Sequence, residues 1–358
     1  MPSARRTRLI EPDDPALQYM GRIDWDDPKG PVWVFPYTQV RFRFTGTSLG
    51  LKVINRRQNG PSHLGVIIDG VQTSLPIDHD GVPVELRAAG DLPDIQHEAV
   101  IFKRQDGQHY LTLLGIEVDR GAGVTPPETP LPSRRMEVFG DSVSCGERNE
   151  ASCYLGREDP PADLTPYSNS WYSYAAMTAR NLNAQLHDIS QGGASLLDGI
   201  GWFNGPDYLG MESIWDKVEY NPALGRVKTW DPKAYDPQVI VVALGQNDSH
   251  PADFMADDYE GVQARLWRTR YVEFIHTLFG LHPRAHIILT TTILIHDLSW
   301  DRAIDQVCRE VGDERVSHFL YSRNGSATPG HPRVAEHREM ADELTAYIRS
   351  LGEGIWNA

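Results

Sequence analysis

Cysteine is scarce in this sequence, and its three occurrences, Cys145, Cys153 and Cys308, form no Cys-x-x-Cys pair. An odd number of thiols cannot all pair with one another, so neither a disulfide framework nor a zinc cluster is predicted. Long apolar runs are also missing, because no stretch approaches the ~20 residues of a membrane span. The basic N-terminus is followed by no apolar segment of the signal-peptide kind. We therefore expect a cytoplasmic protein.

Positive charge is in short supply as well. The 34 Lys and Arg residues face 49 Asp and Glu residues, which gives a formal charge of −15. This balance argues against nucleic acid or an anionic membrane as partner and favours a neutral or small substrate. The histidines show no metal-ligand spacing, so we predict no metal and no cofactor. The pattern gives no indication of the oligomeric state.

The first third of the chain alternates apolar and polar residues with a period of two. Val40, Phe42 and Phe44 alternate with polar neighbours, and Leu51 and Val53 do so again after a Gly-Thr-Ser turn. Further short strands are expected at 64–69, 82–87, 97–103 and 110–118, separated by Asp-Gly turns. Such a series of short strands predicts an antiparallel sandwich of the jelly-roll type.

A proline-rich stretch follows this region. Residues 121–132 contain Pro126, Pro127, Pro130 and Pro132. Proline at this density interrupts helices and central strands, so a domain boundary is expected here. We predict a β-sandwich over residues 1–121, a linker over 122–133 and a catalytic domain over 134–358.

Strands and helices alternate in the remainder of the chain. Apolar runs at 136–139 and 238–244 suit strands buried on both faces, and helices are expected at 170–183, 259–279, 300–311 and 332–350. Further strands are expected at 286–292 and 316–321. This alternation predicts a parallel sheet with helices on both faces. Residues 196–236 fit no regular element and are a candidate substrate-binding region.

Four short stretches fall where strands of that sheet should end. Gly140-Asp141-Ser142 follows the first strand, and Gln191-Gly192-Gly193, Gly245-Gln246-Asn247 and Gly330-His331-Pro332 come later. Open α/β sheets place their chemistry at the carboxyl ends of strands. The four stretches are therefore expected to meet at one site.

These residue types suit acyl transfer. A serine hydroxyl needs a base to become a nucleophile, and a developing oxyanion needs donors aimed at it. We predict Ser142 as the nucleophile, His331 as the base, and Ser142 N–H, Gly193 N–H and the Asn247 amide as oxyanion donors. Gly192 is the nearest rival to Gly193, and a turn serine that caps a helix is the alternative for Ser142.

Three tryptophans lie in the irregular region. Aromatic faces stack on sugars and also fill protein cores. Trp202, Trp215 and Trp230 are therefore candidate substrate-binding residues, with core packing as an equal alternative.

The four blocks, in this order, resemble those of the SGNH (GDSL-like) hydrolases. The stretch Phe139-Gly140-Asp141-Ser142, the strand at 97–104 and the preceding sandwich are more narrowly similar to carbohydrate esterase family 2. This resemblance covers about residues 21–351. It implies an α/β/α, flavodoxin-like catalytic domain and deacetylation of acetylated oligosaccharides or polysaccharides.

One position departs from the usual SGNH pattern. Most of these enzymes carry an aspartate three residues before the histidine, where this sequence has Thr328. Threonine cannot stabilise an imidazolium as a carboxylate does. The resemblance to family 2 therefore implies a Ser-His dyad in which a backbone carbonyl holds His331.

The expected function is that of a metal-independent serine esterase acting on acetylated xylo-, manno- or gluco-oligosaccharides. Two alternatives stay open at this point. Another GDSL-type acyl hydrolase, such as a lipid esterase or thioesterase, would use the same chemistry on a different substrate. A non-catalytic carbohydrate-binding protein would use none of it.

Overall fold

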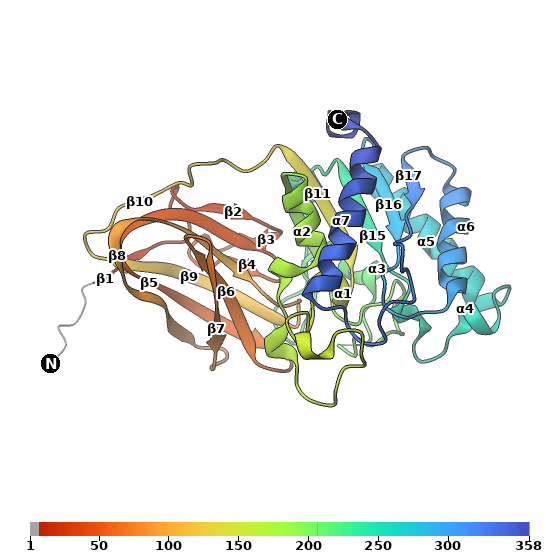
Figure 1. Cartoon of the computed structure of the whole chain (residues 1–358), viewed down its shortest axis with the longest axis horizontal. Helices are drawn as coiled ribbons and strands as arrows, with labels where there is room; N and C mark the ends of the chain where they lie inside the picture. The colour runs from red at the N-terminus through yellow and green to blue at the C-terminus, as the bar shows by residue number, and fades with distance from the viewer. Residues whose placement is uncertain (1–6, 206, 358) are drawn as a thin grey trace.

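The computed structural model describes residues 7–205 and 207–357, in which an antiparallel sheet precedes a parallel one (Figure 1). The antiparallel strands follow the order β3-β4-β9-β5-β8-β6-β7, with β1, β2 and β10 paired at the side. Their bounds are β1 (Thr7–Ile10), β2 (Gln18–Met20), β3 (Ile23–Asp24), β4 (Val32–Trp33), β5 (Gln39–Arg57), β6 (Ser62–Ile68), β7 (Val71–Ile77), β8 (Pro83–Lys103), β9 (His109–Asp119) and β10 (Val124–Thr125).

The apolar members of the alternating pattern form the core of this domain. Val40, Phe42, Leu51 and Val53 are buried at 1% exposure or less. The polar residues that alternate with them are mostly half-buried, as a period of two allows, and Gln39 is buried at 2% exposure. The predicted jelly-roll sandwich is confirmed, and β5 and β8 are its longest strands, with 19 and 21 residues.

Two expected strand breaks are absent. The segments around 40–44 and 49–53 form the single strand β5, and those around 82–87 and 97–103 form β8. The pairing of β5 with β8 shifts register between Gly46 and Ser48 and again between Leu49 and Gly50. A bulge bends a strand without ending it, which is why the Gly-Thr-Ser signal is no turn here.

The proline-rich segment begins as part of the sheet. Val124 and Thr125 pair with Phe44 and Arg43 of β5. The first residues of the predicted linker are thus attached to the antiparallel domain, and the chain then runs to β11 (Arg134–Gly140).

The second domain is an α/β/α sandwich, as predicted. Its parallel strands follow the order β12-β11-β15-β16-β17, the doubly wound order of flavodoxin-like folds. Its strands after β11 are β12 (Ala184–Ser190), β13 (Lys217–Glu219), β14 (Lys228–Thr229), β15 (Val239–Ala243), β16 (His286–Thr290) and β17 (Val316–His318). All five residues of β15 are buried, as expected for the centre of a sheet covered on both faces.

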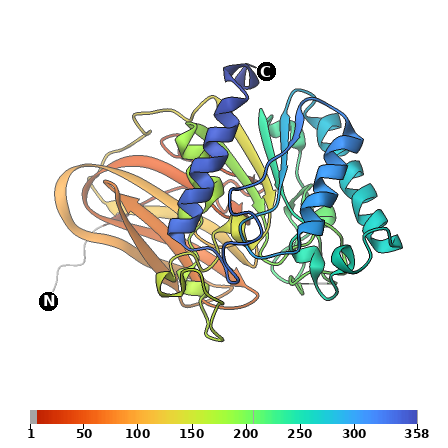
Figure 2. The same ribbon diagram turned by 45° about the vertical axis from the view of Figure 1, so that its right-hand side comes forward.

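Helices cover both faces of the parallel sheet. Figure 2 shows α7 on one side of it and α5 and α6 on the other, and α2 packs on the same core as α7. The α-helices are α1 (Ser142–Cys145), α2 (Tyr174–Asn181), α3 (Met211–Ile214), α4 (Phe254–Asp257), α5 (Val262–Leu281), α6 (Leu298–Val311) and α7 (Val334–Ser350). Short 3₁₀ turns are η1 (Ser152–Tyr154), η2 (Thr165–Tyr167), η3 (Ser170–Tyr172), η4 (Pro232–Ala234), η5 (Asn247–Ser249) and η6 (Glu353–Trp356). Over the described ranges, every helix is too short or too polar to cross a membrane.

Candidate active site

Three adjacent strands deliver their following loops to one edge of the parallel sheet. Ser142 follows β11, Gly193 follows β12, and Asn247 follows β15. Because β12 and β15 flank β11 on opposite sides, this edge is the topological switch point of the sheet. These three loops lie together at this edge, as predicted.

Ser142 is the first residue of α1. Asp141 caps this short helix, because its carboxylate accepts a hydrogen bond from Val143 N at 3.0 Å. Gly140 is required just before it, since a Cβ there would lie 2.1 Å from Ser144 Oγ. The Ser142 side chain makes no hydrogen bond to another described residue, and its main-chain N–H is also free of partners among them. The turn therefore leaves both the hydroxyl and the main-chain N–H of Ser142 available.

The loop after β12 distinguishes Gly193 from Gly192. Gly192 N–H donates to Asp106 Oδ2 at 3.1 Å, so this donor is already used. Gly193 N–H has no partner in the described part of the chain. Gly193 has a φ of +75°, and a Cβ would lie 2.6 Å from Phe203 N, so a glycine is needed there. The available donor is Gly193.

Asn247 lies in η5 with its amide held by two acceptors. Nδ2 donates to Asp141 Oδ2 at 2.9 Å and to Ala194 O at 3.1 Å. The next residue, Asp248, accepts from Leu196 N at 2.9 Å and therefore braces the loop beyond Gly193. Both hydrogens of the Asn247 amide have protein partners in this arrangement.

A carboxylate holds His331, which corrects the expectation of a dyad. Asp159 Oδ2 lies 2.5 Å from His331 Nδ1. Thr328, at the position of the usual aspartate, instead donates to Gly330 O at 3.0 Å. The carboxylate comes from the long segment between α1 and η3, and so could not be found by spacing from the histidine. A carboxylate, and not a backbone carbonyl, is therefore the partner of His331 Nδ1.

Two arginines keep Asp159 ionised. Arg148 Nη1 donates to it at 2.9 Å, and Arg333 Nη2 bonds its other oxygen. Burial alone would raise the pKa of Asp159, but the bonds from His331, Arg333 and Arg148 outweigh burial and hold it well below the usual range. Burial lowers the pKa of His331 despite the opposing effect of Asp159, so the imidazole is neutral near pH 7.

A second acid faces the other ring nitrogen of the histidine. Glu147 Oε2 lies 3.7 Å from His331 Nε2. Burial, and after it the negative charge of Asp106, raise the pKa of Glu147 to about 8. Glu147 is therefore mostly protonated at neutral pH and can both donate and accept hydrogen bonds.

The four predicted catalytic residues line one cavity of about 530 Å³. Trp202 also lines it, with 64% of its surface exposed and its ring stacked on His250 at 3.6 Å between centroids. The remaining lining residues are Asn59, Gln108, Glu147, Arg148, Asp159, Gly192, Phe203, Asn204, Leu294, Pro329 and Gly330. Asn59 and Gln108 belong to the first domain, so both domains build this cavity.

Trp215 and Trp230 are not among the lining residues. Trp215 packs edge-on against Phe274 of α5 at 6.1 Å, and Arg22 lies 5.2 Å above the Trp230 ring. Trp215 thus packs within the second domain, Trp230 contacts a residue of the first domain, and packing is the alternative that holds for both. Of the three tryptophans, the structure brings Trp202 alone to the site.

Several lining residues escaped the sequence analysis. Asn59, Gln108, Glu147, Arg148 and Asp159 lie in loops with no periodic pattern. One signal was present: Arg148 and Asp159 lie in the irregular segment 146–169 after the nucleophile, whose prolines follow Asp159. Long segments of that kind are often functional. In the described ranges, no group of three or more His, Cys, Asp or Glu side chains forms a candidate metal site.

Comparison with known proteins supports the resemblance to carbohydrate esterase family 2. Residues 19–127 match the family described as Carbohydrate esterase 2 N-terminal. Cellulase/esterase CelE of Acetivibrio thermocellus is 29% identical over 97% of this chain, which spans 41% of the length of CelE. An acetylxylan esterase / glucomannan deacetylase of Cellvibrio japonicus is 28% identical over 96% of this chain and 91% of its own length.

Solved structures agree over nearly the whole chain. A family two carbohydrate esterase from Cellvibrio japonicus is 27% identical, with a TM-score of 0.77 and 98% of each chain covered. A family two carbohydrate esterase from Clostridium thermocellum, solved with cellohexaose, is 26% identical with a TM-score of 0.74, covering 94% of this chain and 98% of the other.

The strand order and the loops at its switch point define an SGNH (GDSL-like) hydrolase. The relatives narrow this class further, because they share both domains with the chain. The first domain matches the N-terminal model of carbohydrate esterase family 2, and the whole chain is similar to members of that family, which supports a carboxylic ester hydrolase.

Proposed function

We propose that this protein is a serine esterase that removes O-acetyl groups from a carbohydrate. The observation that carries the proposal is the single cavity lined by Ser142, Gly193, Asn247 and His331, with Asp159 bound to the histidine. The other lining groups include the polar side chains of Asn59, Gln108, Glu147, Arg148 and Asn204. A polar wall suits a sugar with a short acyl group better than a long alkyl chain.

The proposed reaction begins with proton transfer from Ser142 Oγ to His331 Nε2. No hydrogen bond joins these two side chains in the described structure, but such contacts commonly tighten only when substrate is bound. Ser142 Oγ then attacks the acetyl carbonyl, and His331 returns the proton to the departing sugar hydroxyl. A water activated by the same histidine releases acetate from the acyl-enzyme.

The oxyanion would be held by the N–H groups of Ser142 and Gly193 and by Asn247. The first two donors are available at once. Asn247 must exchange its bond to Ala194 O or Asp141 for one to the substrate oxygen. Donors aimed at the developing charge are worth about 10²- to 10³-fold each in rate.

The test is acetate release from acetylated xylo-, manno- and gluco-oligosaccharides. A Ser142→Ala variant should lose at least about 10³-fold in kcat, because the nucleophile is absent. Undiminished acetate release by this variant would overturn the proposal. A preference for long acyl chains over acetyl, measured with a series of p-nitrophenyl esters, would favour a lipid esterase or thioesterase.

A further inference from the structure

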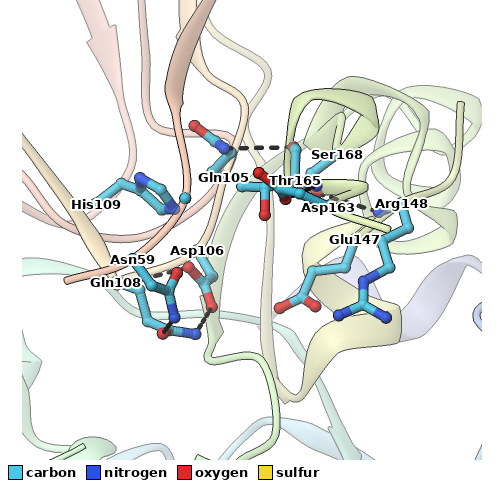
Figure 3. Close-up of a pocket in the computed structure, with 11 residues that line it drawn as sticks. Asn59, Gln105, Asp106, Gln108, His109, Glu147, Arg148, Asp163, Thr165 and Ser168 are labelled. Atoms are coloured by element: carbon cyan, nitrogen blue, oxygen red, sulfur yellow. Dashed lines mark hydrogen bonds between the residues drawn. The ribbon is translucent and has the colours of Figure 1, made fainter. Parts of the chain in front are cut away.

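A second cavity of about 310 Å³ adjoins the first. The two share four lining residues, Asn59, Gln108, Glu147 and Arg148. Figure 3 shows Asn59, Asp106 and Gln108 of the first domain on one side, and Glu147 and Arg148 of the second domain on the other. Glu147 lines the second cavity and also faces His331, so a single side chain separates this cavity from the proposed base.

The wall of the second cavity consists of polar side chains that are buried and fixed by hydrogen bonds within the protein. Gln105, Asp106, His109 and Ser168 line it, and each is exposed by 5% or less. Gln105 Nε2 donates to Pro61 O at 2.8 Å, and Arg148 N donates to Ser168 Oγ at 3.1 Å. Side chains fixed in this way lose little freedom when a ligand binds.

Hydrogen-bonding groups face the cavity from both domains. Asn59 Nδ2 contacts Gln108 Oε1, and Gln108 Nε2 donates to Asp106 Oδ2 at 3.2 Å. His109 uses Nδ1 on Ser62 Oγ at 2.8 Å, and Nε2 has no hydrogen bond to the described protein. Amide, carboxyl and imidazole groups of this kind recognise hydroxyls, which are both donors and acceptors.

The charges of the lining select against an anion. Asp106, Glu147 and Asp163 bring acidic groups to the cavity, and the guanidinium of Arg148 is engaged by Asp159 at 2.9 Å. Since Glu147 is mostly protonated, the like charge that a carboxylate or phosphate would meet comes from Asp106 and Asp163, without a free basic partner. A neutral ligand rich in hydroxyls meets no such penalty.

We propose that this second cavity is a subsite for a neutral sugar residue next to the acetylated one, and that residues of both domains form it. The inference rests on the proposed function, because the subsite would make the esterase prefer an acetylated oligosaccharide to an acetylated monosaccharide. The first domain thereby takes part in recognising substrate.

The test uses two residues that line the second cavity and not the first, Asp163 and Thr165. The double variant Asp163→Ala/Thr165→Ala removes their polar side chains in the full-length protein. It should lower kcat/KM for an acetylated neutral tetrasaccharide by about tenfold, the effect of one lost hydrogen bond. Its kcat/KM for p-nitrophenyl acetate and for an acetylated monosaccharide should stay within twofold. Asp94→Ala, at an exposed position of β8, is the matched control.

The outcomes separate the subsite from the activity. Equal loss on the small and the large substrate, or no loss on the tetrasaccharide, would overturn the subsite while leaving the esterase intact. Absence of acetate release from every sugar ester would instead overturn the proposed function. Binding is measured independently by calorimetry with an unacetylated tetrasaccharide and the Ser142→Ala protein. The added double substitution should weaken this binding by about tenfold, and an unchanged affinity would contradict the subsite.

Discussion

His331 receives its carboxylate partner from far away in the chain. Asp159 precedes it by 172 residues and lies in a loop of another part of the fold. A carboxylate on Nδ1 fixes the tautomer that leaves Nε2 free to accept a proton, and it stabilises the imidazolium that forms. Asp159 is therefore placed to orient the imidazole of His331, which Thr328 cannot do.

Replacing Asp159 by asparagine tests this role. Asp159→Asn keeps the size of the side chain but removes its charge, so kcat for p-nitrophenyl acetate should fall by about 10²- to 10⁴-fold. Thr328→Val, which leaves the Asp159 contact in place, should change kcat by less than about threefold. A loss of activity confined to the Thr328 variant would contradict the orienting role assigned to Asp159.

The pH dependence of activity follows from the histidine. His331 must be neutral to accept the Ser142 proton, so kcat/KM rises with pH through its pKa. Burial lowers that pKa, and the acid limb should therefore have its midpoint below the ordinary value of 6.5. Asp159 raises the pKa of His331, so Asp159→Asn should move the midpoint to still lower pH. A wild-type midpoint above 7 would contradict this assignment.

At the level of single residues, motif order was enough to predict that Ser142, Gly193, Asn247 and His331 lie together, and they line one cavity. These residues follow strand ends, and strand ends leave a local signature. Asp159 leaves none, because its role arises when a long loop folds back onto the start of α7. The sequence pattern therefore identified four residues that line the cavity but missed the carboxylate that contacts His331.

Among the structural elements, the turn between β8 and β9 braces the loop that carries the oxyanion donor. Asp106 Oδ2 accepts from Gln191 Nε2 at 2.6 Å and from Gly192 N at 3.1 Å. The buried Lys103 ammonium donates to the carbonyls of Gln105 and Asp106 and so holds the turn. The position of Gly193 thus depends on the first domain.

We predict that Asp106→Ala lowers kcat for p-nitrophenyl acetate by about 10- to 100-fold, because Gly193 N–H loses its support. KM for this small ester should change by less than about threefold. Asp106→Asn retains an acceptor oxygen and should recover part of the rate. If both variants keep full kcat, the turn does not position the oxyanion loop.

Element types were predictable where the periodicity was strong. The helices α5, α6 and α7 and the strands β15 and β16 lie close to their expected ranges. The lengths of β5 and β8 were not predictable, because a glycine that permits a bulge resembles a glycine that ends a strand. The packing of Trp230 against Arg22 depends on the first domain, which no local pattern contains.

For the whole molecule, a buried ion pair joins the two domains. Arg22 Nη2 bonds Glu137 Oε1 of β11 at 3.0 Å, and both residues are 3% exposed. Arg22 Nη1 also donates to the carbonyls of Trp215 and Lys217, at 2.6 and 2.9 Å. The guanidinium thus satisfies several acceptors that would otherwise be buried without partners.

Removing this guanidinium should destabilise the fold. Arg22→Ala leaves Glu137 buried without its partner, so the free energy of unfolding in urea should fall by about 3–5 kcal/mol. Arg309 forms an exposed pair with Asp305, and Arg309→Ala should cost less than about 1 kcal/mol. Similar losses in the two variants would show that the interdomain pair has no special weight.

The segment between α1 and η3 combines two tasks in one stretch of chain. It carries Asp159, which holds the base, and also Glu147, Arg148 and Asp163, which face the cavities. We expect that a glycan bound at this segment would favour the alignment of His331 with Asp159. Part of the energy of binding remote sugar units should then appear as faster turnover and not only as tighter binding. Chain length of the substrate would in this way set the speed of the chemistry.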